Sequence, residues 1–217
     1  MKGKIIIEFN GAPATGKSTI ISHLKTKSDI GILTIEDLIQ QKPMIYRVIV
    51  KLICCFTSLM FFLSVSNKLN DKLWQIFKII YSYKKYLIYI NSISNGIIII
   101  DEGAIQKSLS IFMRTRNNSV DYYNELYCKF LRKIKLNRTE ILIESTSKVR
   151  QKRKLKRKLP QDYLRSDINS INYESSIFKQ IKINKSNDIN FLFFRNDFPS
   201  DMNLIIDKIL SHIKTKY

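Results

Sequence analysis

Ten residues near the start of the chain, NGAPATGKST at positions 10–19, combine two glycines, a lysine and hydroxyl side chains. Residues 11–18 match the pattern G-x-x-x-x-G-K-[ST], in which backbone N–H groups surround a phosphate group and the lysine adds positive charge. We expect Lys17 to bridge the β- and γ-phosphates of a nucleotide and the Ser18 hydroxyl to bind Mg²⁺. The residues expected to contact the nucleotide are Gly11, Ala12, Pro13, Ala14, Thr15, Gly16, Lys17, Ser18 and Thr19.

Two acidic residues follow a run of isoleucines in the segment GIIIIDEG, residues 96–103. A phosphate-binding loop of this kind needs an acid at the carboxyl end of a neighbouring strand, where it holds Mg²⁺ through water. Asp101 stands at that place, so we expect Asp101 and Ser18 to form the metal site. Glu102 is one residue further on, where it can accept a proton from a substrate hydroxyl.

A strongly basic segment, residues 148–158, contains eight Lys or Arg among eleven residues and no acid. If it is helical, its three arginines lie on one stripe and its leucines on the opposite side. The pattern predicts a helix that packs by Leu155 and Leu159 and directs planar guanidinium groups toward phosphate oxygens. A solvated run of charge, or a patch that binds nucleic acid or lipid, are the alternatives. The arginines of the stripe are Arg150, Arg153 and Arg157.

The segments around these residues alternate between strand and helix patterns. A β-branched run at residues 4–10 leads into the glycine-rich loop, and Ile20, Ile21 and Leu24 follow it at helical spacing. Continuous β-branched runs are typical of parallel strands that are covered on both faces. Further strands are expected at 31–37, 96–103, 139–145 and 189–195. A largely helical block is expected at 44–95. The last helix is expected to have Ser200 as its N-cap and Leu204, Ile205, Ile209 and Ile213 on one face.

Strands that alternate with helices imply right-handed crossovers and a parallel sheet. We therefore expect an α/β fold with a doubly wound parallel sheet of the P-loop NTPase type, of about five strands, with helices on both faces. A helical insertion is expected after the second strand. A length of 217 residues fits one domain, residues 1–217. Within it we expect a helical acceptor-side region at about 42–95 and a basic, lid-like segment at about 146–160.

The composition is that of a globular protein, but the charge is unusual. Apolar residues make up 45% of the chain and charged residues 25%, which excludes a disordered chain. The net charge of +19 favours binding of polyanions, anionic lipid headgroups or phosphorylated ligands. Because the chain is rich in Lys, Asn and Ile throughout, coding bias explains the excess equally well.

An apolar run without a charged residue, LICCFTSLMFFLSV, spans residues 52–65. It is shorter than the ~20 residues needed to cross a bilayer, so we expect a buried helix of a soluble core. A helix that lies on the membrane surface is the alternative. Cys54 and Cys55 are expected to be buried there as small apolar residues. With Cys128 they form no metal-ligand spacing, which fits a reducing compartment. We expect a cytoplasmic protein, either free or peripheral to the membrane.

The three motifs together resemble the P-loop nucleoside and nucleotide kinases, particularly thymidylate-kinase-like proteins. IIIEFNGAPATGKSTI is similar to the opening strand, loop and helix of that group, and FFRNDFPSDMNLIIDKIL to its last strand and C-terminal helix. ILIESTSKVRQKRKLKRK resembles its fourth strand and the lid, which carries two arginines four residues apart. The resemblance implies that Arg153 and Arg157 clamp the donor phosphates and stabilise the phosphoryl group during transfer. Glu102 stands where thymidylate kinases have an arginine, which is closer to kinases whose acceptor is a bare hydroxyl.

These observations predict an ATP-dependent small-molecule kinase that uses ATP and Mg²⁺. Its acceptor is expected to be a hydroxyl or a monophosphate of a nucleoside, nucleotide or sugar-like molecule. Candidate acceptor contacts are Glu36, Asp37, Arg114 and Arg116. The alternative is a P-loop ATPase or binding module that acts on a polyanion, such as a nucleic acid or a lipid-linked glycan. A contact between the basic surface and an anionic membrane is a further hypothesis. ATP and GTP are not distinguished, and the oligomeric state is open.

Overall fold

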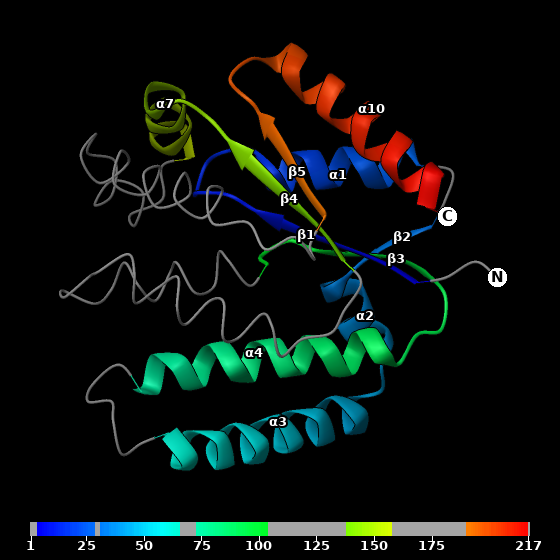
Figure 1. The fold of residues 1–217 in the computed structure, drawn as a ribbon, viewed down its shortest axis with the longest axis vertical. Helices are drawn as coiled ribbons and strands as arrows, with labels where there is room; N and C mark the ends of the chain where they lie inside the picture. The colour runs from blue at the N-terminus through cyan, green and yellow to red at the C-terminus, as the bar shows by residue number, and fades with distance from the viewer. Residues whose placement is uncertain (1–3, 29–30, 66–72, 104–137, 158–189, 217) are drawn as a thin grey trace.

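A five-stranded sheet forms the centre of the molecule, and every neighbouring pair of its strands is parallel (Figure 1). The computed structural model describes residues 4–28, 31–65, 73–103, 138–157 and 190–216. The strands are β1 (Lys4–Asn10), β2 (Ile32–Thr34), β3 (Gly96–Ile100), β4 (Arg138–Glu144) and β5 (Asn190–Arg195). They lie in the order β2-β3-β1-β4-β5, so the predicted doubly wound parallel sheet is confirmed.

Helices cover both faces of the sheet (Figure 1). One face packs against α1 and α10, and the other lies over α2 and α4. The long helix α3 lies outside α4, as the helix farthest from the sheet (Figure 1). The helices are α1 (Lys17–Lys27), α2 (Ile35–Gln41), α3 (Met44–Val65), α4 (Leu73–Asn91), α7 (Ser147–Arg157) and α10 (Pro199–Lys216). The helical insertion after the second strand is therefore confirmed.

Strand β1 contributes side chains to two hydrophobic cores, one on each face of the sheet. Successive side chains of a strand point to opposite faces of the sheet. Ile5, Ile7 and Phe9 accordingly enter the core beneath α1 and α10, whereas Ile6 enters the core beneath α2 and α4. The isoleucines of β3 are at most 1% exposed, because that strand is paired on both sides and covered on both faces. Continuous β-branched runs are the sequence signature of such strands.

The second strand is shorter than the sequence predicts. A strand was expected over residues 31–37, but β2 ends at Thr34 and a helix follows at once. The Thr34 side chain accepts a hydrogen bond from the Asp37 N–H, and the Asp37 carboxylate accepts one from the Thr34 N–H at 2.7 Å. This reciprocal capping box starts α2. Glu36 and Asp37 therefore lie in the first turn of a helix and do not end a strand.

The apolar run at residues 52–65 is helical, but the prediction of a buried helix is wrong. One side of α3 packs on α4, where Val50 and Cys54 are buried. The opposite side is exposed, and Leu52 and Phe56 are 64% and 66% exposed. Cys55 is also exposed, so only one of the two adjacent cysteines is the buried residue expected; Cys128 lies outside the described residues. No helix in the described part of the chain is long and apolar enough to cross a membrane.

The C-terminal helix begins earlier than predicted. It starts at Pro199, so Ser200 is not its N-cap. The Asp201 carboxylate instead accepts hydrogen bonds from the N–H groups of Asp197 and Phe198, both at 2.9 Å, which caps the helix start from its first turn. The predicted apolar face is correct for Ile205, Ile209 and Ile213, whereas Leu204 is 57% exposed.

Candidate active site

The loop between β1 and α1 is held in a shape that only glycine permits at two positions. Gly11 and Gly16 have φ angles of 146° and 94°, which residues with a side chain rarely adopt. A Cβ atom at Gly11 would collide with the carbonyl oxygen of Ile143, and one at Gly16 would lie 2.5 Å from the Asn196 amide nitrogen. The loop therefore needs both glycines, because β4 and the segment after β5 press against it.

The N-terminal end of α1 lies at the glycine-rich loop. Among the described residues, no side chain caps this helix, and no acidic residue lies in its first turn. The backbone N–H groups and the dipole of a helix end make it a favourable place for a phosphate. Ser18 and Thr19 are exposed in this turn. The predicted anion-binding loop thus leads directly into the N-terminal end of a helix.

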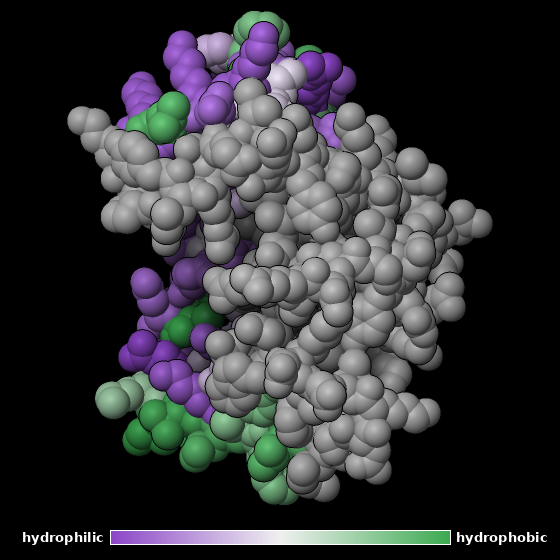
Figure 2. All heavy atoms as spheres, turned by 90° about the vertical axis from the view of Figure 1, so that its left-hand side faces the viewer, coloured by the Kyte–Doolittle hydropathy of each residue, from purple (hydrophilic) through white to green (hydrophobic). Residues whose placement is uncertain are grey.

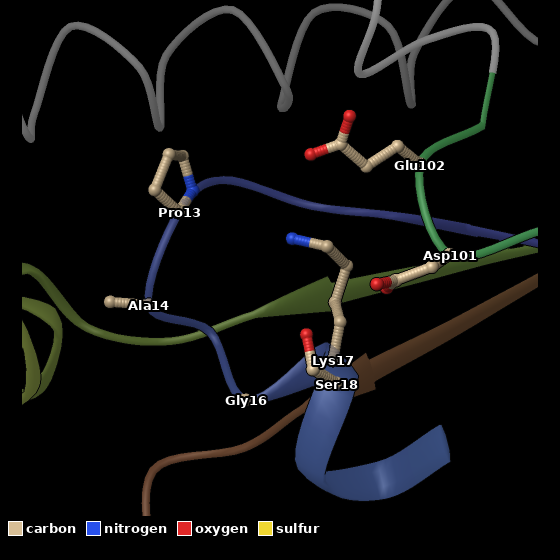
Figure 3. A pocket seen from close by; sticks show the side chains of 7 residues that line it. All are labelled: Pro13, Ala14, Gly16, Lys17, Ser18, Asp101 and Glu102. Carbon is tan, nitrogen blue, oxygen red and sulfur yellow. The ribbon is translucent and has the colours of Figure 1, made fainter. Parts of the chain in front are cut away.

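A pocket of about 170 Å³ opens at this helix end. Its lining residues are Pro13, Ala14, Gly16, Lys17, Ser18, Asp101 and Glu102 (Figure 3). The side chains of Lys17 and Glu102 extend into it from α1 and from the segment after β3 (Figure 3). The structure therefore brings the predicted loop residues and the two predicted acids together, although they are more than 80 positions apart in the chain.

The Lys17 ammonium lies inside the curve of the loop. Its Nζ donates hydrogen bonds to the carbonyl oxygens of Gly11 at 2.7 Å and Ala12 at 3.2 Å, and the residue is 7% exposed. These two carbonyl oxygens hold the positive charge of Lys17 at the wall of the pocket. A phosphate that enters the pocket meets this charge together with the N–H groups of the helix end.

Asp101 carries a buried carboxylate oxygen that lacks a partner. Its Oδ1 atom accepts no hydrogen bond within the described residues. Burial raises the pKa of Asp101, an effect that the nearby Lys17 charge counteracts and the Glu102 charge increases. This carboxylate and the Ser18 hydroxyl line the same pocket, and together they offer the hard oxygen ligands that Mg²⁺ prefers. Mg²⁺ usually keeps several waters, so two protein oxygens suffice.

A tyrosine that sequence reasoning missed lies within electrostatic range of the two pocket acids. Burial raises the pKa of Tyr86, and the negative charges of Glu36, Glu102 and Asp101 raise it further. A tyrosine on α4 thus lies within electrostatic range of three carboxylates from α2 and from the end of β3. Tyr86 is one of several tyrosines at helical spacing in α4, so spacing alone did not distinguish it.

Two arginines of α7 brace the outer side of the phosphate-binding loop. Arg150 Nε donates to the Pro13 carbonyl oxygen at 3.1 Å, and Arg153 Nη1 donates to the Thr15 carbonyl oxygen at 3.2 Å. Arg150 is 1% exposed, and burial lowers its pKa to about 10, against the opposing effect of Glu144. Neither arginine is among the residues that line this pocket, and both contact backbone carbonyl oxygens of the loop.

The packing of α7 differs from the sequence prediction. Leu155 is 44% exposed, whereas Arg150 and Lys154 are each 1% exposed. The helix therefore packs by its basic side, because carbonyl oxygens of the loop offer acceptors that leucine cannot use. Arg157 is the last residue of α7, and the placement of its side chain is outside what the structure describes. Arg114, Arg116 and Leu159 also lie outside the described residues.

Asn196, just after β5, connects the loop, β4 and α7. Sequence analysis did not predict this role. Its Nδ2 donates to the Thr15 carbonyl oxygen at 2.8 Å, and its N–H donates to the Glu144 carbonyl oxygen at 2.8 Å. Its own carbonyl oxygen accepts hydrogen bonds from Ser145 Oγ and from Arg153 Nη1. One asparagine thus ties the loop to β4 and to α7. No sequence motif marks it.

Comparison with known proteins supports the fold. No protein-family model matches the chain, and no curated protein sequence matches it. Solved structures of deoxyadenosine kinase from M. mycoides are similar to it. The complex with dCTP has a TM-score of 0.56 and 19% identity over 95% of this chain and 100% of that chain. The complex with products dCMP and a flexible dCDP has a TM-score of 0.58 and 18% identity over 95% and 100%.

A third structure of the same enzyme, with bound dATP, has a TM-score of 0.53 and 18% identity, and the alignment covers 94% of this chain and 99% of that chain. The described part of the chain therefore shares the fold of these kinase structures, and the predicted α/β class is confirmed. The thymidylate-kinase-like subtype that the sequence suggested is not the one these structures represent.

Proposed function

We propose that this chain is an ATP-dependent kinase that transfers the γ-phosphoryl group of ATP to a hydroxyl of a nucleoside. The observation that carries the proposal is the position of Glu102, which lines the same pocket as Lys17 and faces it from a different element. A phosphate-binding group and a proton acceptor at one pocket are the two parts that transfer to a hydroxyl requires. The nucleoside kinase fold of the similar structures supports the same assignment.

The donor phosphates would occupy the end of α1. The N–H groups of the loop bind the β-phosphate, and Lys17 leaves its carbonyl acceptors to bridge the β- and γ-phosphates. Ser18 and Asp101 would hold Mg²⁺, which neutralises charge on the donor phosphates. Arg153 and Arg157 were expected to clamp these phosphates. The backbone contacts of Arg153 support a different part for it, which is to hold the loop in its binding shape.

The charge around the acceptor side favours a neutral hydroxyl over a monophosphate. Asp101, Glu102 and Glu36 place three carboxylates near Tyr86, and a phosphate dianion would be repelled there. Glu102 would take the proton of the attacking hydroxyl as the oxygen–phosphorus bond forms. Tyr86, on α4, would contact the acceptor molecule.

The alternative of a polyanion-binding ATPase loses part of its support. Its main sequence feature was the basic segment, but Arg150 and Lys154 are buried and Arg153 donates to the phosphate-binding loop. Side chains engaged in this way are not available to a nucleic acid backbone.

An acceptor screen tests the proposal. ADP release from Mg·ATP is measured with nucleosides, nucleoside monophosphates and sugars as acceptors. We expect release with a nucleoside, its loss in Lys17→Ala, and a fall in kcat of roughly 10²–10⁴-fold in Glu102→Gln with the fold retained. Full activity of Lys17→Ala would overturn the proposal. A preference for monophosphates would overturn the acceptor class.

Glu36→Gln provides the matched comparison for the proton acceptor. Glu36 is also an exposed acid near Tyr86, but it is not among the residues that line the pocket. We expect its substitution to change kcat much less than Glu102→Gln does. The reverse order would assign the proton transfer to Glu36.

A further inference from the structure

The turn that follows β3 is attached to β1 at both of its ends. At its start, Ile100 is the last residue of β3 and pairs with Glu8 of β1. At its end, the Gly103 N–H donates a hydrogen bond to the Phe9 carbonyl oxygen at 3.1 Å. The chain advances three residues between these points while β1 advances one, so the two pocket acids between them bend away from the strand.

Gly103 has no room for a side chain beside the end of β1. A Cβ atom at this position would lie 2.6 Å from Oδ1 and 2.9 Å from Nδ2 of Asn10. The φ angle of Gly103 is not in the left-handed region, so glycine is required here by space and not by backbone conformation. At Gly31, by comparison, an added Cβ atom would meet nothing within 4 Å.

Asn10, the last residue of β1, cannot move aside to make room. It is fully buried, and its backbone is aligned with Leu142 of the neighbouring strand β4. Because its side chain is short, the amide cannot turn away into solvent. Asn10 and Gly103 are both buried, whereas Figure 2 shows hydrophobic side chains exposed at the end of the molecule that α3 forms. Their contact therefore belongs to the interior of the chain and limits how closely the turn approaches β1.

Asn10 also leads directly into the phosphate-binding loop. The next residue, Gly11, accepts the hydrogen bond from Lys17 Nζ at 2.7 Å. Asn10 therefore lies between the turn that carries Glu102 and the part of the loop that holds Lys17. Figure 3 shows that the side chains of Lys17 and Glu102 reach the pocket from these two segments. Their relative position across the pocket thus depends on the residue that joins the segments.

We propose that Asn10 and Gly103 are positioning residues that place Glu102 at the pocket. This role rests on the proposed function, in which Glu102 accepts the proton of the attacking hydroxyl. A methyl group at position 103 would push the turn away from β1 and move Glu102, whereas Lys17 and the loop would stay in place. A displacement of about 1 Å in a catalytic group can slow a reaction roughly 10²-fold.

The first test is Gly103→Ala, assayed by ADP release from Mg·ATP with the nucleoside that the wild type uses. The kcat should fall roughly 10²-fold, while KM for ATP stays within about twofold because the donor loop is unchanged. Gly31→Ala is the control and should keep the wild-type kcat. A fully active Gly103→Ala protein would overturn the positioning role alone, whereas an inactive wild type would overturn the proposed function and this role with it.

A double-mutant cycle tests whether the effect passes through Asn10. Asn10→Ala removes the three atoms nearest to a Cβ atom at position 103. In that background, Gly103→Ala should lower kcat by less than about threefold, because the added methyl group occupies vacated space. Equal losses in both backgrounds would overturn the proposal. If Gly103→Ala does not fold, Asn10→Ala alone should still lower kcat, because the turn loses its support, and an unchanged kcat would overturn the proposal.

A second cycle, with Glu102→Gln, distinguishes positioning from a purely structural role. Glu102→Gln has no proton acceptor to displace, so Gly103→Ala should not lower its kcat further. A further loss in this background would overturn the proposal, because the effect would not pass through Glu102. Urea denaturation of the same proteins provides the second measurement. A Gly103→Ala protein that is less stable but keeps its kcat when folded would also overturn the proposal.

Discussion

The two faces of the sheet are built from the same strands but from different chemistry. Toward α1 and α10, β1 and its neighbours contribute mainly aliphatic and aromatic side chains, with the buried Thr139 of β4 as a polar exception. Toward α2 and α4, the face is apolar near β3 but charged between β1 and β4. There Arg138 lies 3.0 Å from the Glu140 carboxylate and 3.8 Å from the Glu8 carboxylate, and all three residues are at most 4% exposed.

The two faces therefore contribute to stability in different ways. Aliphatic burial on the α1 and α10 face contributes free energy in proportion to area and does not depend on pH. Buried charge on the other face is costly unless each group keeps its partners. The two faces should therefore respond differently to the loss of one side chain.

The largest effect is expected from Arg138→Met, which removes a cation from between two buried carboxylates. It should lower the free energy of unfolding by about 3–5 kcal/mol at neutral pH. Urea denaturation measures the loss, and Lys208→Met, at an exposed lysine of α10, is the control, expected to change it by less than about 0.5 kcal/mol. A loss no larger than that of the control would contradict the account.

On the aliphatic face, Ile7→Ala should lower the free energy of unfolding by about 3 kcal/mol. Ile7 is fully buried between α1 and the sheet, so its loss leaves a cavity. Because no charge is involved, the cost should be equal at neutral and acidic pH in the same urea experiment. A strong pH dependence would show that the two faces do not differ as described.

A smaller effect is expected where β3 ends at the pocket. The pKa of Asp101 is raised by burial, so the folded state keeps the proton at pH values where the unfolded chain has lost it. Stability is then lost as pH rises from about 4 through the raised pKa. Asp101→Asn should remove that loss and raise the melting temperature at neutral pH, while it abolishes Mg²⁺-dependent turnover. A destabilised Asp101→Asn protein would contradict the assignment.

The smallest effect concerns His212 of α10, which contacts Thr139 at the edge of the aliphatic face at 3.1 Å. Burial, and then the Lys216 charge, lower the pKa of His212 below its ordinary value near 6.5. The unfolded chain therefore takes up a proton first as pH falls through about 6.5, and stability decreases. His212→Gln should reduce the change of melting temperature with pH over this range. An unchanged pH dependence would exclude His212 as its source.

The local elements were largely predictable because they depend on short-range patterns. The isoleucine runs of β1 and β3 could only be buried parallel strands, and the glycines, Lys17 and Ser18 define the loop that follows β1. Asp101 was predictable for the same reason, since the end of a parallel strand has a fixed place at the sheet edge. The exceptions are also local: Thr34 and Asp37 form a capping box that turned an expected strand into α2.

The choice of packing partner was not predictable from the sequence. The basic side of α7 is buried because the loop offers carbonyl acceptors to Arg150 and Arg153, which no periodicity reveals. Asn196 and Tyr86 reach the site from segments whose composition carries no motif.

By itself, the sequence determined that a glycine-rich loop follows the first strand and that an acid follows the isoleucine strand, because both depend on neighbours in the chain. Only the tertiary structure decided which face of each helix is covered, since that depends on contacts between segments far apart in sequence. The apolar side of α3 is the clearest case: its residues are those of a buried helix, yet the fold leaves them exposed.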